Sequence, residues 1–270
     1  MGTRLKAWLL ENGWPDWIVP GYWFMLCLSL ILGSLLALHL WKRSGQDKQR
    51  ASDLIFWAIP SLLIGAKLFY WMQYGFPGNL DLWNSGGISL YGGFFGLIAA
   101  WLIQYWIRPY PILLFLDCAT PSLALGLFFT RIGCFLAGCN GGAPCDLPWA
   151  VRFPSTTSTF HHLLTLGLAR SGEKLSPPVH PTQLYESLFG LIAFGMLMWF
   201  FRRRQGDGRV FFSGMAAYGI FRFFMETIRS DAGGLHPFGV LTFSQTISLL
   251  IVAASLAGLL WPRAHRPNVL

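Results

Sequence analysis

The sequence has few charged residues. Only 12% of its 270 residues are Asp, Glu, Lys or Arg, whereas 54% are hydrophobic and 16% are aromatic. A soluble domain of this length would carry about twice that charged fraction. The mean hydropathy is +0.48, and several apolar runs reach about 20 residues, the length that crosses roughly 30 Å of hydrocarbon. The composition therefore excludes an ordinary soluble domain and predicts an all-α polytopic membrane protein.

Other features are missing as well. Residues 1–19 contain Glu11, Pro15 and Asp16 and lack the continuous apolar core of a cleavable signal peptide, so none is expected. The apolar runs do not alternate apolar and polar residues in segments of about ten, as strands of a membrane barrel would. The net charge of +8 sits in short loops beside apolar runs. Such a distribution is typical of membrane topology, so no nucleic-acid partner is expected.

The apolar runs predict seven membrane-spanning helices. Their expected ranges are 20–41, 54–74, 87–107, 112–130, 183–201, 210–228 and 241–261. Eleven Lys and Arg residues fall on the side reached after the first, third, fifth and last spans, and seven fall on the other side over much more chain. Because cytoplasmic loops carry an excess of Lys and Arg, the N-terminus is expected outside and the C-terminus in the cytoplasm.

One long connection separates the fourth and fifth spans. Residues 131–182 are rich in Gly, Pro, Ser and Thr, and connections of this length are usually functional or disordered. Residues 149–154 indicate a short strand or extended piece within it. We therefore expect a single membrane domain over residues 1–270 that carries a small periplasmic cap at 131–182. The stretch from Arg131 onward, rich in Gly and Cys, is expected to leave the helix and form a turn.

Polar residues gather in the outer halves of the predicted spans. They are Lys67, Ser89, Tyr91, Arg131, Tyr185, Glu186, Tyr218, Arg222, Glu226 and Gln245. Ionisable residues within spans are costly and mark functional sites. Since six helices bring polar groups to one depth, a single outward-facing cavity is expected; separate structural pairs are the alternative. Asp117 lies near the cytoplasmic side, where a pairing or capping role is expected.

The charges of this cavity favour an anionic ligand. Arg131 and Arg222 carry permanently charged guanidinium groups, whose paired N–H donors suit phosphate oxygens. Glu226 stands one turn from Arg222 and three residues from Arg229, so it compensates part of the charge. Arg131 is left without an acidic partner in this pattern, and Lys67 adds a further cation. A phosphate beside apolar helices indicates a phospholipid headgroup, whereas a buried Arg–Glu clamp between helices is the structural alternative.

Four segments of the chain form motifs in a fixed order. Residues 86–96 resemble the pattern Gly-Gly-x-Ser-x-His-Gly-Gly-x-x-Gly, and residues 131–139 resemble Arg-x-Gly-Asn-Phe-x-Asn-Gly-Glu. Residues 180–186 match His-Pro-x-Gln-x-Tyr-Glu, and residues 218–229 match Tyr-x-x-x-Arg-x-x-x-Glu-x-x-Arg. Together the four resemble the motifs of the prolipoprotein diacylglyceryl transferase family, over roughly residues 20–250. The resemblance also implies seven spans with the N-terminus outside.

The resemblance implies transfer of a diacylglyceryl group from phosphatidylglycerol to the lipobox cysteine of a preprolipoprotein, in a bacterial cytoplasmic (inner) membrane with the site facing the periplasm. It implies Arg131, Arg222, Tyr91 and Glu226 as catalytic residues and no cofactor. The substrate-binding residues that it implies are Tyr22, Lys67, Ser89, Gly92, Gly93, Cys134, Cys139, Asn140, His180, Gln183, Tyr185, Glu186, Tyr218 and Arg229. Gly92 and Gly93 are also expected at a close helix contact.

The chain departs from these motifs at several positions. Tyr91 stands where the family carries a histidine, often proposed as the base, and the reference pKa of Tyr, near 10, makes it a poor base. Cys134 and Cys139 stand where the signature carries Asn and Glu, and Lys67 replaces an arginine. His180 is a candidate for the missing base. On this resemblance, the chain is interpreted as a divergent member of the family.

The cysteines allow several interpretations. Cys134, Cys139 and Cys145 cluster just after the fourth span. Their spacing matches no common Cys-x-x-Cys pattern, so no metal is expected, even with His161 and His162 downstream. A Cys139–Cys145 disulfide, simple packing in a turn, and a nucleophilic cysteine stay open.

Three functions compete at this point. The first is lipid-to-protein diacylglyceryl transfer. The second is a related phospholipid-dependent transferase with a different acceptor, which the changes at Tyr91 and the cysteines would permit. The third is a non-enzymatic transporter or lipid-binding protein. Transporters often show internal repeats and midplane sites, and this sequence has no visible repeat and keeps its polar groups in the outer half.

Overall fold

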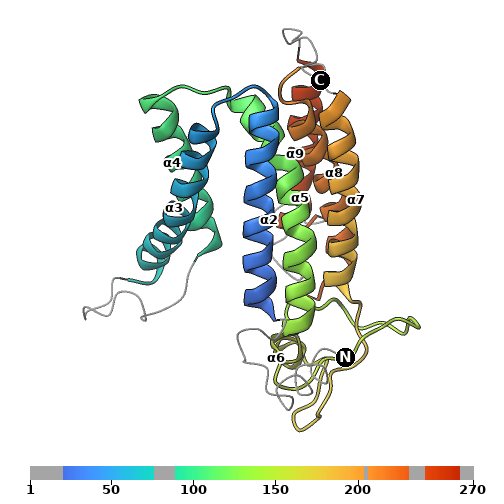
Figure 1. The fold of residues 1–270 in the computed structure, drawn as a ribbon. Coiled ribbons are helices and arrows are strands. Elements are labelled where there is room, and N and C mark those ends of the chain that lie inside the picture. The colour runs from blue at the N-terminus through green and yellow to red at the C-terminus, as the bar shows by residue number, and fades with distance from the viewer. Residues whose placement is uncertain (1–20, 76–88, 204–205, 231–240, 262–270) are drawn as a thin grey trace, which may run out of the picture. The chain divides into compact units, whose positions relative to one another are not determined.

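The computed structural model describes residues 21–75, 89–203, 206–230 and 241–261 (Figure 1). Within these ranges the chain forms eight α-helices, one 3-10 helix and isolated β-bridges, without a named strand. The helices are α2 (Tyr22–Arg43), α3 (Lys48–Tyr74), α4 (Leu90–Ile107), α5 (Ile112–Ala137), α6 (Ser158–Thr165), α7 (Thr182–Arg203), α8 (Arg209–Met225), η1 (Glu226–Ile228) and α9 (Phe243–Leu260). The Gly86–Ile88 part of the first motif and the start of the span predicted from residue 87 lie outside the described residues.

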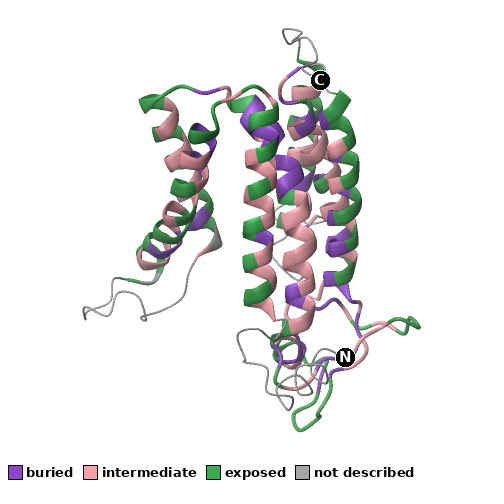
Figure 2. Ribbon diagram, viewed as in Figure 1, coloured by how far each residue is buried: buried purple, intermediate pink, exposed green. Residues whose placement is uncertain are grey.

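The prediction of an all-helical membrane protein is confirmed. Among the described residues, five helices are long and apolar enough to cross a membrane: α2, α3, α5, α7 and α9. The apolar stretch of α4 that begins at Tyr91 is shorter. Large apolar side chains cover the outside of these helices, as Leu30, Ile31 and Leu35 do on α2, and Figure 2 shows the same pattern of exposed residues along the helices. A surface of this kind is typical of contact with lipid.

The fourth predicted span ends too early. Helix α5 continues past residue 130 through Arg131 to Ala137, so the expectation that this stretch is a turn is wrong. Gly133 lies inside this extension of the helix, at a close contact with α2. A Cβ there would stand 3.0 Å from Met25 Cβ and 3.3 Å from Tyr22 Cα. The helix stops at Gly138, which takes the left-handed conformation with φ +71°.

The chain divides into two compact units. The first joins Met1–Leu36 to Leu116–Leu270 and the second is Ala37–Phe115. In the first unit, glycines let helices approach closely: a Cβ on Gly190 of α7 would lie 2.9 Å from Phe128 N of α5, and one on Gly219 of α8 would lie 3.0 Å from Ser248 O of α9. Close backbone contacts between small residues are a common way to associate helices in membranes.

Asp117 has the structural role expected of it. It is fully buried on α5, and its carboxylate accepts hydrogen bonds from Gly208 N at 2.6 Å and Phe211 N at 2.8 Å. These are amide groups at the start of α8, which have no partner within that helix. Asp117 therefore caps α8, and its negative charge interacts favourably with the positive end of the dipole of that helix.

The second unit contains the helix pair α3–α4. A Cβ on Gly65 of α3 would collide with Gly92 O and lie 2.8 Å from Gly96 Cα, and one on Gly92 would collide with Gly65 O and Phe69 Cβ. Near the other end of the pair, Arg50 is buried and donates to Gln104 Oε1 at 2.8 Å. The expected close helix contact at Gly92 and Gly93 is thus confirmed.

The connection between α5 and α7 is folded around a small core. Phe153, Phe160, Leu163, Ala169 and Val179 are buried together in it. The extended piece predicted at 149–154 is present in part, because Val151 bridges Val179 and Pro154 bridges Leu175. His161 and His162 lie on α6, where His161 is exposed. We call residues 138–181 the cap.

Candidate functional site

Glu186 is the centre of an ionic group in the first unit. It lies one turn into α7 and is almost completely buried. Its Oε2 forms an ion pair with Arg131 Nε from the last turns of α5, and its Oε1 lies 3.3 Å from Arg229 Nη1. The expectation that Arg131 has no acidic partner is therefore wrong. One carboxylate holds two guanidinium groups from different parts of the chain.

A second ion pair lies at the end of α8. Arg222 Nη1 is 2.5 Å from Glu226 Oε2, four residues later, as the predicted spacing requires. Thr242 at the start of α9 donates to Glu226 Oε1 at 3.1 Å, and Arg222 Nη2 donates to Ser244 Oγ at 3.3 Å. Glu226 is buried and Arg222 is partly exposed. Two residues of α9 thus fix the orientation of the Arg222–Glu226 pair.

The two ion pairs belong to one region because a short segment joins them. The 3-10 turn η1 carries the chain from Glu226 to Arg229, and Arg229 forms a bridge with Gly142 of the cap. Ala143 N donates to Ile228 O at 2.9 Å. A Cβ on Gly142 would stand 2.7 Å from Ile228 O, so only glycine fits this approach. The residues Arg131, Glu186, Arg229, Arg222 and Glu226 are called the arginine–glutamate cluster below.

The cluster carries an excess of positive charge. Three arginines face two glutamates, and both glutamates are buried whereas the Arg131 and Arg222 side chains are each about one-fifth exposed. Arginine presents several N–H donors, so an ion pair through one of them leaves the others for a ligand. An anion with several oxygens, such as a phosphate, is the ligand that suits this arrangement.

The first turn of α7 closes over the end of α5. Thr182 donates from its hydroxyl to Asn140 O at 2.8 Å, and Gln183 donates from Nε2 to Cys139 O at 2.7 Å. Gln183 is fully buried, and its Oε1 accepts no hydrogen bond from the described residues. A buried acceptor without a donor costs free energy, about 1–3 kcal/mol. A ligand hydroxyl or amide at this position would remove that cost.

Cys134 and Cys139 lie beside Arg131. Asn140 Nδ2 is 3.9 Å from Cys134 Sγ, and Cys139 Sγ donates to Cys134 O at 3.5 Å. The pKa of the Cys139 thiol is raised, first by its hydrogen bond to the Cys134 side chain and then by burial. Neither Cys139 nor Cys145 is in a disulfide, so the bond considered between them is not formed.

His180 and Tyr185 form a polar pair at the start of α7. Trp149 Nε1 donates to Tyr185 OH at 2.7 Å, and His180 Nδ1 lies 3.4 Å from the same oxygen. Because the indole can only donate, the phenol proton is free to point toward His180. The His180 backbone is held between cap segments, since Gly142 N donates to His180 O at 3.0 Å. The structure therefore holds His180 and Tyr185 together where the cap enters α7, just before Glu186.

The remaining predicted residues of the first unit lie on its helices. Tyr22 begins α2, and its backbone packs at Gly133, which lies between Arg131 and Cys134 on α5. Tyr218 lies on α8 one turn before Arg222 and is exposed, with its ring 6.4 Å from that of Phe189. Helices α2, α5, α7 and α8 and the cap thus all contribute predicted residues to this unit.

Five predicted site residues belong to the second unit instead. Lys67 is buried, with its ammonium 5.8 Å from the centre of the Trp71 ring. Ser89 caps α4 by accepting from Gly92 N at 3.5 Å, and Gly92 and Gly93 pack against α3. Tyr91 is 63% exposed within the described residues. The contacts explain the two glycines by packing, and the binding roles of all five stay predictions.

Sequence reasoning missed two polar contributors from α9. Thr242 and Ser244 contact the Arg222–Glu226 pair, whereas only Gln245 had been placed in the polar layer. The signal was present: Thr242 and Gln245 form a capping box, in which the Thr242 hydroxyl accepts from Gln245 N and Gln245 Oε1 accepts from Thr242 N. A Thr followed three residues later by Gln before an apolar run marks such a helix start.

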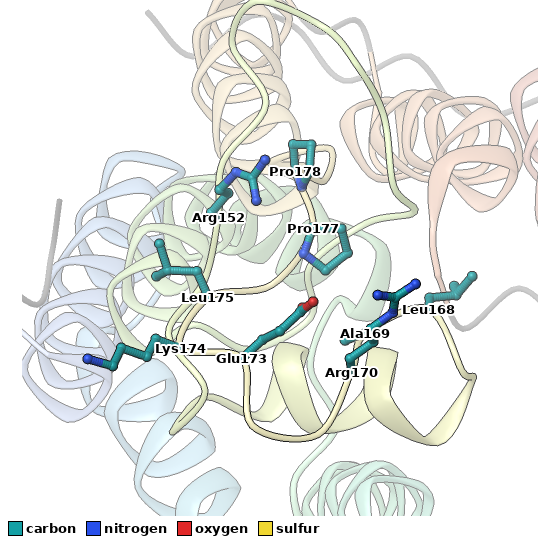
Figure 3. Close-up of a pocket in the computed structure, with 9 residues that line it drawn as sticks. All are labelled: Arg152, Leu168, Ala169, Arg170, Glu173, Lys174, Leu175, Pro177 and Pro178. Atoms are coloured by element: carbon teal, nitrogen blue, oxygen red, sulfur yellow. The ribbon is translucent and has the colours of Figure 1, made fainter.

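The cap also has an open cavity of about 550 Å³ (Figure 3). Arg152, Arg170, Glu173 and Lys174 form its charged part, over a wall that includes Pro177 and Pro178. The four charged residues are exposed. None of the residues that line this cavity was predicted as a site residue, and all of them belong to the cap.

Comparisons with known proteins agree on one family. A family model described as prolipoprotein diacylglyceryl transferase matches residues 15–261. Relatives named phosphatidylglycerol–prolipoprotein diacylglyceryl transferase occur in several bacteria. The protein of Pseudoalteromonas translucida is 33% identical over 81% of this chain and 78% of its own length. The protein of Finegoldia magna is 32% identical over 86% of this chain and 87% of its own length. The protein of Pseudomonas fluorescens is 33% identical over 83% of this chain and 80% of its own length.

Proposed function

We propose the function of this chain from one premise, that it belongs to the prolipoprotein diacylglyceryl transferase family. It transfers the diacylglyceryl group of phosphatidylglycerol to the lipobox cysteine thiol of a preprolipoprotein. A thioether forms, and the bond between the glyceryl carbon and the phosphate oxygen breaks, so glycerol phosphate leaves. The observation that carries this proposal is the arginine–glutamate cluster, which holds excess positive charge at the ends of apolar helices.

The cluster supports the chemistry through electrostatics. Arg131 and Arg222 neutralise the headgroup phosphate and the second negative charge that develops on it as the carbon–oxygen bond breaks. Donors fixed in advance stabilise a transition state without reorganising during the reaction. The acceptor must be a thiolate to attack. The arginines therefore act on the leaving group, and another group takes the proton of the thiol.

The glutamates orient the arginines. Glu186 holds Arg131 and Arg229 at fixed positions, and Glu226 holds Arg222 with the help of Thr242. Breaking a buried ion pair from one side costs about 3–5 kcal/mol because a charge is left uncompensated. Loss of either glutamate therefore moves the phosphate-binding groups as well as weakening the fold.

Gln183 is proposed to bind the glycerol moiety. Its Oε1 is a buried acceptor without a donor among the described residues. A hydroxyl of the phosphatidylglycerol headgroup supplies such a donor. Tyr185 and Tyr218 have phenol groups at the start of α7 and one turn before Arg222, and are proposed to donate to the glycerol or phosphate oxygens.

The proposed topology has seven spans with the N-terminus outside, in the bacterial cytoplasmic membrane. The five long apolar helices and the shorter apolar α4 support it. The excess of Lys and Arg in the loops after the first, third and fifth predicted spans supports the orientation. The cap and the arginine–glutamate cluster then face the periplasm.

A second candidate differs only in the acceptor. Tyr91, Cys134 and Cys139 stand where the resembled motifs carry His, Asn and Glu. These changes favour a transferase that keeps the phosphatidylglycerol site and uses another thiol or hydroxyl acceptor. The nature of the lipid-modified product distinguishes the two candidates.

Complementation tests the proposal. A bacterial strain depleted of its own diacylglyceryl transferase should grow when it expresses this chain, and should not grow with Arg131→Ala or Arg222→Ala. Arg170→Ala, an exposed arginine of the cap cavity, is the matched control and should complement. Failure of the wild-type chain, when it is stably present in the membrane, would overturn lipoprotein modification as its function.

A further inference from the structure

The end of α5 places two cysteines against each other. Gly138 is left-handed, Gly138 N donates to Phe135 O at 3.2 Å, and Cys139 N donates to Cys134 O at 3.0 Å. This pair of hydrogen bonds is the Schellman motif, in which the residue after the left-handed glycine contacts the residue five positions earlier. Those two residues are ordinarily apolar, and here they are Cys139 and Cys134.

The contacts of the side chains agree with the backbone. Cys139 Sγ lies 3.5 Å from Cys134 O, so the Cys139 side chain turns back toward Cys134. Cys134 is buried and Cys139 is half-buried, so one of the two thiols is open to a small reagent. Asn140 Nδ2 lies 3.9 Å from the Cys134 sulfur, and Arg131 stands three residues before Cys134 on α5. The two thiols therefore lie within the region of the arginine–glutamate cluster.

We propose that Cys134 and Cys139 are a dithiol–disulfide site that links the end of α5 to the first residues of the cap. The reaction is exchange with an oxidant of the disulfide class, such as oxidised glutathione or a protein disulfide. A Cys134–Cys139 bond forms, the sulfur–sulfur bond of the oxidant breaks, and the two thiol protons and two electrons pass to the oxidant as two thiols. Cys139 N already donates to Cys134 O at 3.0 Å, so the helix end holds the two residues together before the bond forms.

The other cysteines do not compete for this bond. Cys145 N donates to Pro178 O in the bridged part of the cap. Cys118 is sixteen residues before Cys134 on the same helix, which separates them by about 24 Å. Cys27 is exposed on α2. The Cys139–Cys145 pairing that the sequence left open is thus replaced by a pairing that the helix end favours.

Oxidation changes the surroundings of Arg131. The Cys139 thiol loses the proton that it donates to Cys134 O, and the Cys134 sulfur, three residues after Arg131 on α5, becomes a poorer acceptor for Asn140. The ion pair of Arg131 with Glu186 and the contact of Gln183 with Cys139 O do not involve the sulfurs. An oxidising surrounding for the site in the cell follows only from the periplasmic placement in the proposed function; the pairing itself does not depend on it.

Peptide mass spectrometry tests the pairing on the full chain in detergent. The protein is equilibrated in buffers of increasing oxidised-to-reduced glutathione ratio, free thiols are blocked with a maleimide, and trypsin releases residues 132–152 after Arg131. This peptide contains Cys134, Cys139 and Cys145. The expected product has lost two hydrogens and carries one maleimide, on Cys145.

Variants complete the test. Cys145→Ser should leave the bond unchanged, and Cys134→Ser and Cys139→Ser should each abolish it. A peptide with three maleimides at every ratio, or one linked through Cys145, would contradict the proposal. The readout is a mass, so it stands whether or not the chain transfers diacylglyceryl groups.

Discussion

The two units use their predicted site residues in opposite ways. In the first unit, charged residues from α5, α7 and α8 meet in direct ion pairs, with Glu186 between Arg131 and Arg229. In the second unit, Gly92 and Gly93 pack closely against α3, and Tyr91 is exposed. The charged residues of the first unit need partners and therefore meet in one region, whereas the two glycines are satisfied by helix packing alone.

The two kinds of motif therefore have different roles in the two units. The arginine–glutamate motifs mark groups that can act on a ligand, because their charge is held in place and is in excess. The glycine motif marks the close approach of two helices, which fixes the residues that follow it. Substitutions in the two units should therefore separate into losses of turnover and losses of helix packing.

The largest effect on stability is expected at Glu186. Glu186→Ala leaves Arg131 and Arg229 without their carboxylate and should lower the free energy of unfolding by about 3–5 kcal/mol. Thermal unfolding in detergent measures it. Glu173→Ala, an exposed glutamate of the cap cavity, is the control and should change stability little. Equal unfolding temperatures for the two variants would contradict the ion pairs of the first unit.

The arginines should give the next largest effect, on turnover. Arg222→Ala removes a donor to the developing charge and should lower kcat by on the order of 10²–10³. Arg222→Lys keeps the charge but loses the paired N–H donors of the guanidinium, so its kcat should lie between those of Arg222→Ala and the wild type. Single-turnover rates with labelled phosphatidylglycerol measure the effect. An Arg222→Ala enzyme with unchanged turnover would remove this residue from the site.

A bulky residue at Gly92 should damage packing in the second unit. Gly92→Val places methyl groups where Gly65 O and Phe69 Cβ already lie, which costs about 1–3 kcal/mol or more. Gly195→Ala on α7 meets no atom within 4 Å and serves as the tolerated control. If Gly92→Val kept full stability while losing phosphatidylglycerol binding, the glycine would be a ligand contact and the contrast between the units would fail.

The smallest effect is expected from Tyr91→Phe. The change removes only a hydroxyl from an exposed side chain, so stability should not change. If the phenol donates to substrate, turnover falls about fivefold, as for one hydrogen bond of about 1 kcal/mol, while phosphatidylglycerol still binds. Unchanged turnover would exclude Tyr91 from the mechanism.

The sequence predicted the features that are local. The apolar runs predicted membrane helices, the spacing of Arg222 and Glu226 predicted their ion pair, and the position of Asp117 predicted a cap. Each depends on residues close in the chain or on composition. The resemblance to one family was confirmed by comparison.

The sequence could not predict features that depend on distant contacts. The partners of Glu186 are 43 and 55 residues away in the chain, and no periodicity relates them. The continuation of α5 past Arg131 depends on α2 packing at Gly133 and on the left-handed Gly138. The contact of Cys134 with Cys139 follows from that helix end, so it too was hidden.

The most direct test of the proposed function is the product balance of the purified chain. The protein in nanodiscs is given phosphatidylglycerol labelled in the headgroup and a peptide with a lipobox cysteine, and released glycerol phosphate is compared with thioether-linked peptide. The proposal predicts equal amounts of the two products, and formation of both slower by on the order of 10²–10³ with Arg222→Ala. Glycerol phosphate without modified peptide, or no release from a folded wild-type chain, would contradict it.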